Sequence, residues 1–184
     1  MATIFSHALV AISVAYVLKP KQVPPYYYTS CVLLSVLPDA DVLGFRYGIA
    51  YGDLWGHRGL SHSISFALLF SLVWLWVQQR GSSTFVLSWK QANSWQLLGV
   101  YTLVMVSHGL LDMLTNGGLG VALFSPFENS RYFFPWHSIM VSPIGLHGWS
   151  WDRIRAIASN ELALLVLPAL LCACFAWILR QSRR

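Results

Sequence analysis

Charged residues are scarce in this sequence, and their scarcity excludes an ordinary soluble domain. Asp, Glu, Lys and Arg make up 10% of the 184 residues, against about 25% in a typical soluble domain. Apolar residues account for 56% of the chain. The composition therefore indicates an integral membrane protein, and the length fits a single domain over residues 1–184. The net charge of +5 does not indicate nucleic-acid binding, because the basic residues are scattered beside apolar runs.

Cysteine is scarce as well, and its positions exclude a disulfide framework. The three cysteines, Cys31, Cys172 and Cys174, lie inside apolar stretches. Cys172 and Cys174 are two residues apart, so on a helix they point to nearly opposite sides. We expect all three to be buried apolar thiols rather than zinc ligands. The first segment, MATIFSHALVAISVAYVL, lacks the positive region and the clear cleavage site of a signal peptide, so we interpret it as a retained helix.

Long apolar runs are abundant, and they predict an all-α polytopic membrane bundle. Five apolar segments lie at residues 2–18, 25–37, 60–79, 95–114 and 161–179. The last three have the roughly 20 residues that a bilayer core requires. The second is short and ends at Pro38, so we expect it to stop partway through the bilayer, against a protein or water-filled cavity. The stretch from 115 to 160 is predicted to be a long outer loop.

The basic residues predict the orientation of the bundle. One set of loops and the C-terminal tail contain seven basic residues and no acidic residue. These seven are Lys19, Lys21, Arg80, Lys90, Arg180, Arg183 and Arg184. The opposite side contains the other five basic residues together with all seven acidic residues. By the positive-inside rule the first side is cytoplasmic, which puts the N-terminus on the outer side and the C-terminus in the cytoplasm.

Histidines and carboxylates gather at one depth in the outer half of the predicted bundle. Counted from the cytoplasmic end of its segment, His7 lies twelve residues in, Asp39 thirteen and His108 twelve. At 1.5 Å per helical residue, each is roughly 18–20 Å above the cytoplasmic boundary of a core about 30 Å thick. Ionisable groups are costly inside a bilayer and usually mark function. Three separate segments therefore predict one shared intramembrane site.

Two short motifs supply further candidate ligands to this site. SHGLLD contains His108 and Asp112, which are four residues apart and share one helix face. The pair can bind one metal ion, or Asp112 can orient His108 through a hydrogen bond. LPDADVLG contains Asp39 and Asp41 at the end of a segment. These carboxylates are candidate ligands as well, although residues of this type are also common in turns.

The motif GHRGLSHS combines histidines with an arginine and hydroxyls just before an apolar run. His57 and His62 are five residues apart, which suits one ligand on a loop and a second in the first helical turn. The two glycines of the motif permit the tight backbone that this arrangement needs. Ser61 is a plausible helix N-cap, and with Arg58 it would favour an anion. The alternative is an interfacial loop with snorkelling side chains.

The predicted outer loop and the last segment add candidates with less specific signals. Arg131 lies among aromatic residues, where it can clamp a phosphate by bidentate hydrogen bonds or face lipid headgroups. Glu161 begins the last apolar segment and is a candidate ligand, base or N-terminal helix charge. His137 and His147 are candidate late ligands, but an interfacial position explains them equally well.

The combination of SHALVA, LPDADVLG, GHRGLSHS, SHGLLD and SNELALLVLP resembles the YdjM-type inner-membrane metal-dependent hydrolase family over nearly the whole chain. The resemblance implies a bacterial inner-membrane protein that binds a divalent metal. Ser61 stands where the family commonly has Thr, which keeps the hydroxyl. The residues that match the family's polar set are His7, Asp39, Asp41, His57, His62, His108 and Asp112. His137 and His147 match no motif of the family.

A looser resemblance concerns the order of the ligands. Zinc-dependent phospholipase C enzymes also place an early His, an Asp, a His and then an HxxxD pair within helices, which is similar to the order in this chain. Together the resemblances imply metal-assisted hydrolysis of a phosphoester, and hydrolysis of an acyl ester or amide stays open. Because the predicted site lies partway into the bilayer and is rimmed by aromatic residues, we expect a lipid or lipid-linked substrate. One to three divalent ions, most plausibly zinc, would activate a water molecule.

These expectations assign a role to each candidate residue and leave two alternatives. Asp41 would bridge the metals or act as general base, with Glu161 as a second catalytic candidate, and Arg58, Arg131 and Ser61 would bind the substrate. The first alternative is a transporter or channel for a divalent metal or protons, because intramembrane His and Asp serve ion pathways too. The second is an inactive, metal-stabilised assembly protein. Membrane lipids are the expected partners, and no nucleic acid is expected.

Overall fold

The computed structural model describes residues 1–81, 91–145 and 148–182, and its regular structure in these ranges is helical. Six α-helices are connected by turns and by two 3-10 helices and one π-helical turn. The elements are α1 (Ile4–Val17), α2 (Tyr27–Val36), η1 (Leu37–Tyr47), η2 (Leu60–His62), α3 (Ile64–Gly81), α4 (Ala92–Met113), α5 (Trp151–Glu161), η3 (Leu162–Val166) and α6 (Leu167–Gln181). Apart from two isolated bridges, the described ranges contain no β-structure. The prediction of an all-α fold is confirmed.

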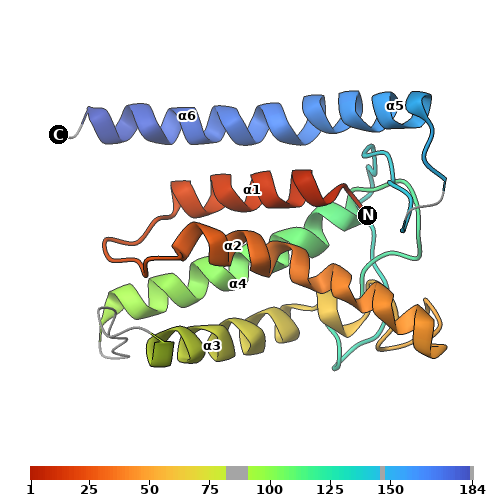
Figure 1. The fold of residues 1–184 in the computed structure, drawn as a ribbon, viewed down its shortest axis with the longest axis horizontal. Helices are drawn as coiled ribbons and strands as arrows, with labels where there is room; N and C mark the ends of the chain where they lie inside the picture. The colour runs from red at the N-terminus through yellow and green to blue at the C-terminus, as the bar shows by residue number, and fades with distance from the viewer. Residues whose placement is uncertain (82–90, 146–147, 183–184) are drawn as a thin grey trace.

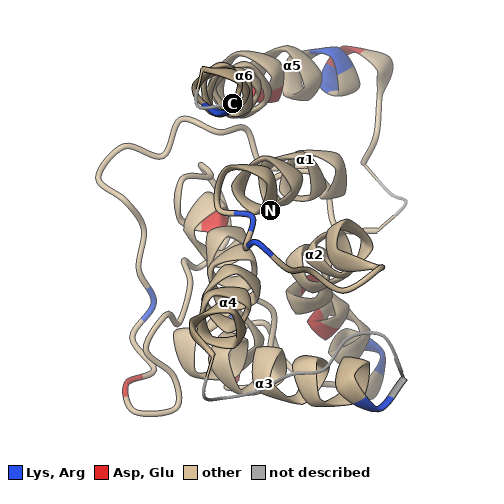
Figure 2. Cartoon of the chain, turned by 90° about the vertical axis from the view of Figure 1, so that its left-hand side faces the viewer, with Lys and Arg blue, Asp and Glu red and all other residues tan. Residues whose placement is uncertain are grey.

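The helices form an antiparallel bundle with two distinct ends. The N-terminus, η1 and the loops that follow η1 and α4 lie at one end, and the α1–α2 connection, the end of α3 and the C-terminus lie at the other (Figure 1). Helices α1 to α4 pack against one another, and the continuous α5–η3–α6 helix lies along α1 at one edge (Figure 2). Lys19, Lys21 and Arg180 belong to the second end. The side of the membrane that each end faces stays a prediction.

Five apolar helical segments match the predicted number of membrane segments. Three are long and apolar enough to cross a membrane, Tyr27–Tyr47, Ala92–Met113 and Trp151–Gln181. Ile4–Val17 and Ile64–Arg80 are shorter apolar helices. Large apolar side chains also cover the outside of the bundle, among them Leu69, Leu171 and Phe175, each more than 60% exposed. Water would solvate such a surface poorly, whereas the chains of a bilayer match it.

The second segment differs from its prediction in how it ends. The α-helix stops at Val36, next to Pro38, as the sequence indicates, but the chain continues in the same direction as the 3-10 helix η1. Proline is tolerated in the first turn of a helix because the missing N–H has no partner there in any case. Helix and extension together are long enough to span the bilayer, and Asp39 and Asp41 lie on the extension.

The last helix begins ten residues earlier than expected. Ser150 caps it by accepting a hydrogen bond from the Arg153 N–H. The negative charge of Asp152 in the first turn interacts favourably with the positive end of the helix dipole. Because α5 contains charged residues, its turns do not belong to an apolar run, and hydropathy alone does not predict them as part of the helix. The helix of 31 residues is about 46 Å long, so it exceeds a bilayer core of about 30 Å. The prediction that Glu161 begins the helix is therefore wrong.

Two smaller expectations also need correction. Cys31 is buried as predicted, but Cys172 and Cys174 are exposed on α6, where they line open grooves between α6 and α1. Ser61 does not cap α3, because it lies inside η2. The Ser63 hydroxyl instead accepts a hydrogen bond from the Phe66 N–H at the start of α3.

Glu161 fastens the long helix to the N-terminus of α1. Its carboxylate accepts hydrogen bonds from the Thr3 N–H at 2.6 Å, from the Thr3 hydroxyl and from the Ser6 hydroxyl at 2.7 Å. The residue is buried, with only 4% of its surface exposed. First-turn N–H groups of a helix lack partners within the helix, so a carboxylate placed there is favourable. The geometry gives Glu161 a structural role between α1 and the α5–α6 helix.

We expect Glu161→Ala to lower the stability of the bundle by about 1–3 kcal/mol, because the hydroxyl and N–H donors of Thr3 and Ser6 lose their acceptor. Thermal unfolding of the purified protein in detergent micelles measures the change. Asp152→Ala is a matched control, since Asp152 is exposed on the same helix and should shift stability by no more than about 0.5 kcal/mol. Equal melting temperatures for the two variants would contradict the assignment.

Candidate metal centre

The GHRG loop has a backbone that only glycine permits at two positions. A Cβ atom on Gly56 would lie 2.2 Å from the Ala50 carbonyl oxygen, and one on Gly59 would lie 2.2 Å from the Leu54 carbonyl oxygen. Between them Arg58 adopts a left-handed conformation with φ of 63°, which is uncommon for a residue with a side chain. The tight loop turns the two histidines and the arginine of the motif inward, toward the ends of α2 and α4.

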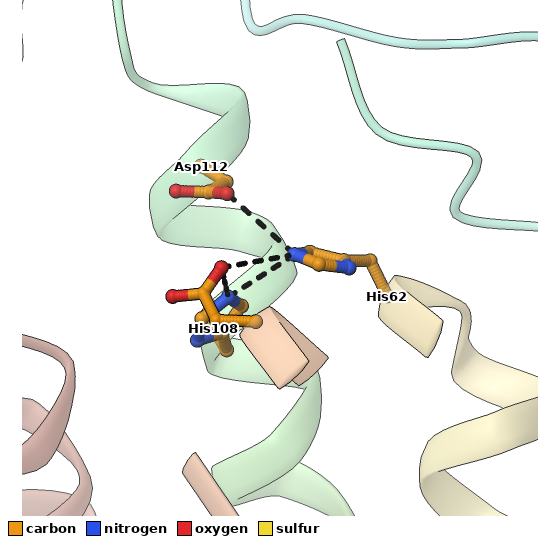
Figure 3. A group of neighbouring side chains, drawn as sticks. His62, His108 and Asp112 are labelled. Carbon is orange, nitrogen blue, oxygen red and sulfur yellow. Dashed lines mark hydrogen bonds and ion pairs between the residues drawn. The ribbon is translucent and has the colours of Figure 1, made fainter. Parts of the chain in front are cut away.

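Four side chains from three elements converge on a single point. His62 from η2 points toward His108 and Asp112 on α4 (Figure 3), and Asp39 approaches from η1. The Nε2 atoms of His62 and His108 are 3.1 Å apart, and His108 Nε2 is 3.3 Å from Asp39 Oδ1. One ligand atom from each of the four residues lies within 4.8 Å of all the others. We call Asp39, His62, His108 and Asp112 the metal-ligand group.

The hydrogen bonds of the two histidines fix which nitrogen atoms face the centre of this group. His108 Nδ1 lies 2.6 Å from the Ser35 carbonyl oxygen, which only accepts, so Nδ1 holds the proton and Nε2 has a lone pair. His62 Nδ1 lies 2.9 Å from Ser61 Oγ and 3.2 Å from Asp41 Oδ2, so its neutral ring also directs a lone pair from Nε2. Two lone pairs that face each other at 3.1 Å need a cation or a proton between them.

Asp41 is the centre of a second cluster that holds the loop histidines in place. Its carboxylate oxygens accept from His57 Nδ1 at 2.7 Å, from Ser61 Oγ at 2.6 Å and from the Arg58 N–H at 3.2 Å, besides the contact with His62. Asp41, His57 and His62 also form a set of potential ligands, which we call the Asp41 group. Because both oxygens of Asp41 already have donors, its geometry favours orienting the histidines over bridging two metals.

Several polar atoms in the two groups and in the neighbouring His7 are buried without a hydrogen-bond partner. They include both nitrogens of His7, both oxygens of Asp39 and Nε2 of His57. His7 stacks on the His108 ring with 3.8 Å between the ring centroids, and its Nε2 is 3.6 Å from Asp112 Oδ1. Buried polar atoms are almost always hydrogen-bonded in proteins. Unpaired nitrogen and oxygen atoms gathered in one cluster are therefore the pattern expected of ligands for a cation.

Arg58 compensates only part of the negative charge in the cluster. Its fully buried guanidinium donates from Nε to Asp112 Oδ2 at 3.0 Å, from Nη1 to the Gly117 carbonyl at 2.7 Å and from Nη2 to Thr115 Oγ1 at 2.8 Å. The three carboxylates of the two groups then leave two negative charges that no side chain in the cluster neutralises while the histidines are neutral. A cation bound among these carboxylates would supply charge of the sign that they require.

The remaining predicted substrate ligands already have protein partners. The Arg131 guanidinium donates to the carbonyl oxygens of His57 at 2.9 Å, Tyr51 at 3.0 Å and Asp53 at 3.2 Å, so it ties the loop after η1 to the loop after α4. Burial among these groups lowers the pKa of Arg131 from its ordinary value. Ser61 donates to Asp41, as described above. Phosphate binding by Arg58, Arg131 and Ser61 stays a prediction, and for Arg58 the geometry favours a structural role.

Other candidates lie apart from the cluster. His137 is exposed, with Nδ1 3.0 Å from the Phe134 carbonyl oxygen, and belongs to neither group. His147 lies outside the described residues. Glu161 belongs to neither group as well.

Sequence reasoning overlooked several groups that support the cluster. The Ser35 carbonyl sets the tautomer of His108, Thr115 receives the Arg58 guanidinium, and the Ala2 N–H donates to Asp112 Oδ1 at 3.1 Å. Thr115 lies about one helical turn after Asp112, and this spacing in the sequence indicates that the two side chains can lie close together. The two backbone groups have no signal in the side-chain pattern.

Comparison with known proteins agrees with the motifs. The model of the YdjM family, described as YdjM inner membrane protein, matches residues 1–183. The chain is 34% identical to inner membrane protein YbcI of Escherichia coli (strain K12) over 181 residues, which is 98% of this chain and 100% of YbcI. No solved structure matches the chain. Together with the apolar helices, these similarities support a location in a bacterial inner membrane. The chain belongs to the YdjM family of inner membrane proteins.

Proposed function

We propose that the protein is a membrane-embedded, metal-dependent hydrolase that cleaves a phosphoester of a lipid or lipid-linked substrate. The observation that supports it best is the pair of inward-facing Nε2 atoms, 3.1 Å apart, beside the unpaired carboxylate of Asp39. Imidazole and carboxylate ligands in a set of four match a divalent metal of the zinc type. The site lies within the apolar bundle, which favours a substrate that resides in the membrane.

A single ion fits the residues best. The metal-ligand group offers four ligand atoms from four residues. The Asp41 group shares His62 with it, and the 2.7 Å contact between Asp41 and His57 is already a hydrogen bond without a metal. His62 therefore presents Nε2 to the metal and Nδ1 to Asp41, the arrangement in which a carboxylate orients a metal-bound histidine. Further ions, up to the three considered from the sequence, have no comparable set of free atoms.

The protein groups divide into holding, orienting and proton-transfer roles. A divalent ion in the site would supply a Lewis acid and lower the pKa of water that it binds toward about 7. Asp39, His62, His108 and Asp112 would hold it, and the stacked His7 ring fixes the plane of His108. His57 is positioned by Asp41 through Nδ1, and its unpaired Nε2 is the atom we assign to proton transfer. Arg58 compensates the charge of Asp112 by donating from Nε to its Oδ2 atom.

Ion transport, the alternative from another class, has less support. A pathway needs polar groups that continue through the membrane. Below the cluster the bundle is filled by an apolar core. Ser30, Gln78 and Tyr101 lie in that region, but they hydrogen-bond to one another. The core residues from the four packed helices include Ala11, Ala15, Cys31, Leu34, Leu75, Leu97, Val104 and Met105.

Metal content is the first test. Purified wild-type protein is expected to contain about one transition-metal ion per chain, and His108→Ala is expected to lose most of it because the variant removes one of four ligands. Elemental mass spectrometry after extensive dialysis measures the content. His137→Ala is the matched control, since His137 is exposed and belongs to neither group. A metal-free wild type, or equal content in both variants, would overturn the site.

Activity tests the reaction itself. Metal-loaded protein in mixed micelles is expected to release headgroup or phosphate from at least one phospholipid in a panel of phosphatidic acid, phosphatidylglycerol and phosphatidylethanolamine. Asp41→Asn is expected to lower the rate by about 10–100-fold, because the histidines lose the carboxylate that orients them. Asp152→Asn should leave the rate unchanged. If no phosphoester is cleaved while the protein moves metal ions across proteoliposomes, the transporter is the correct function.

Arg58→Lys separates a positioning role from a substrate-binding role. Lysine keeps the charge but not the three directed donors, so the variant should bind the metal about 10–100-fold more weakly, as expected when a group that supports a ligand is changed. Competition with a metal-chelating dye measures this affinity, and Arg46→Lys is an exposed control. A raised KM for substrate at unchanged metal affinity would instead place Arg58 on the substrate.

A further inference from the structure

A pocket of about 330 Å³ lies between η1 and the beginning of α3. Its inner end is polar, and its walls are aromatic and aliphatic. The residues that define it are Asp41, Ser61, Ile49, Trp55, Phe66 and Phe70. Its volume is within the roughly 300–1,000 Å³ range of small-molecule sites.

The inner end of this pocket belongs to the proposed catalytic cluster. The Ser61 hydroxyl donates to Asp41 at 2.6 Å, and Asp41 contacts both His57 and His62. Four other grooves of the described structure are larger, with volumes of about 420 to 500 Å³, but none of them is lined by a member of the metal-ligand group or the Asp41 group. The pocket beside η1 is thus a route from the outside of the bundle to the cluster.

A row of aromatic rings continues the apolar wall along α3. Phe66 and Phe70 stack with 5.7 Å between their ring centroids, and Phe70 and Trp74 stack with 6.4 Å between theirs. The spacing of four residues puts the three rings on one face of the helix. Phe66 and Phe70 are only partly buried. The row begins next to the cluster and runs along the apolar helix Ile64–Arg80 toward the opposite end of the bundle.

We propose that this pocket binds one hydrocarbon chain of a membrane lipid, with the lipid's polar end toward Asp41, Ser61 and the histidines. The proposal rests on the proposed function, because it names the part of the substrate that the site recognises. Most of the lining residues belong to the apolar helical segments Tyr27–Tyr47 and Ile64–Arg80, so lipid chains would surround this part of the bundle. A helix from a partner protein, about 10 Å wide, is too thick for this volume, whereas an extended chain is not.

The pocket also explains how substrate reaches a buried centre. The side chains of the metal-ligand group are at most 11% exposed, and Arg131 ties down the loops above them. An opening in the side of the bundle lets a lipid approach from the bilayer without leaving it. The half-buried faces of Phe66 and Phe70 would then set how much chain the pocket accepts.

Photo-crosslinking tests the proposal without requiring turnover. The full-length protein is reconstituted in vesicles of phosphatidylethanolamine and phosphatidylglycerol that contain a small fraction of phosphatidylglycerol with a diazirine in one acyl chain. After illumination, mass spectrometry locates the labelled residues. Labels are expected on the pocket residues Ile49, Phe66 and Phe70. An excess of unlabelled phosphatidylglycerol should reduce these labels strongly. The labels on the outer face of α6 should fall only as far as the probe is diluted in the bulk lipid.

Phe70→Trp should fill the pocket and lower labelling there about tenfold. A loss of about 1.4 kcal/mol in the binding free energy of the lipid chain corresponds to this change. Leu69→Trp is the matched control, because the neighbouring Leu69 is 62% exposed on the same helix and outside the pocket. If Phe70→Trp unfolds, the competition with unlabelled lipid still decides the question. Labels confined to the outer faces, or pocket labels that resist both competition and Phe70→Trp, would overturn the proposal.

The outcome is separable from the fate of the hydrolase assignment. If the wild type contains no metal and cleaves no phosphoester, yet pocket labelling responds to Phe70→Trp, the lipid site stands and the proposed function falls. If phosphoester cleavage is confirmed but labelling avoids the pocket, the substrate enters by another route and this inference alone is wrong.

Discussion

The ion pair between Arg58 and Asp112 is the interaction on which the rest of the cluster depends. Asp112 is completely buried near the end of a membrane helix, where an uncompensated carboxylate would cost several kcal/mol. Arg58 neutralises one of its oxygens and also binds Thr115 and the Gly117 carbonyl, which fixes the chain after α4. Because Arg58 lies in the GHRG loop, the same contact sets the position of both loop histidines.

The cluster therefore combines residues on the helices α1 and α4 with residues on the tight GHRG loop. α4 presents His108 and Asp112 from one face, and α1 brings His7 against them. The loop supplies His62 and the Asp41 partners only because the glycines allow the backbone to turn tightly between the ends of the helices. Three carboxylates in this space repel one another until positive charge balances them, and the proposed divalent ion would add to the charge that Arg58 supplies. Metal binding and loop closure should reinforce each other.

Much of this arrangement was predictable, because helical rise converts sequence position into depth. The matched depths of His7, Asp39 and His108 predict their meeting, and the spacing of His108 and Asp112 predicts a shared face. The partners of Arg58 were not predictable, since charge pairing between a loop and α4 leaves no periodic signal. The start of α5 was hidden for a different reason: its charged turns obey capping rules, not hydropathy. Glu161 was misplaced as a consequence.

The position of the cluster favours the proposed enzyme pocket over an ion pathway. The His and Asp side chains lie at one end of the bundle, and apolar side chains fill the space between the four packed helices beneath them. In the part of the chain that the structure describes, the polar side chains of Ser30, Gln78 and Tyr101 in this region hydrogen-bond to one another, which does not favour an onward path for an ion. The pocket beside η1 opens sideways instead and joins the Asp41 group to an apolar wall. The metal-ligand group lies above an apolar core, and the pocket beside η1 has an apolar wall at the side of the bundle. This arrangement suits the proposed reaction on a lipid better than the passage of an ion.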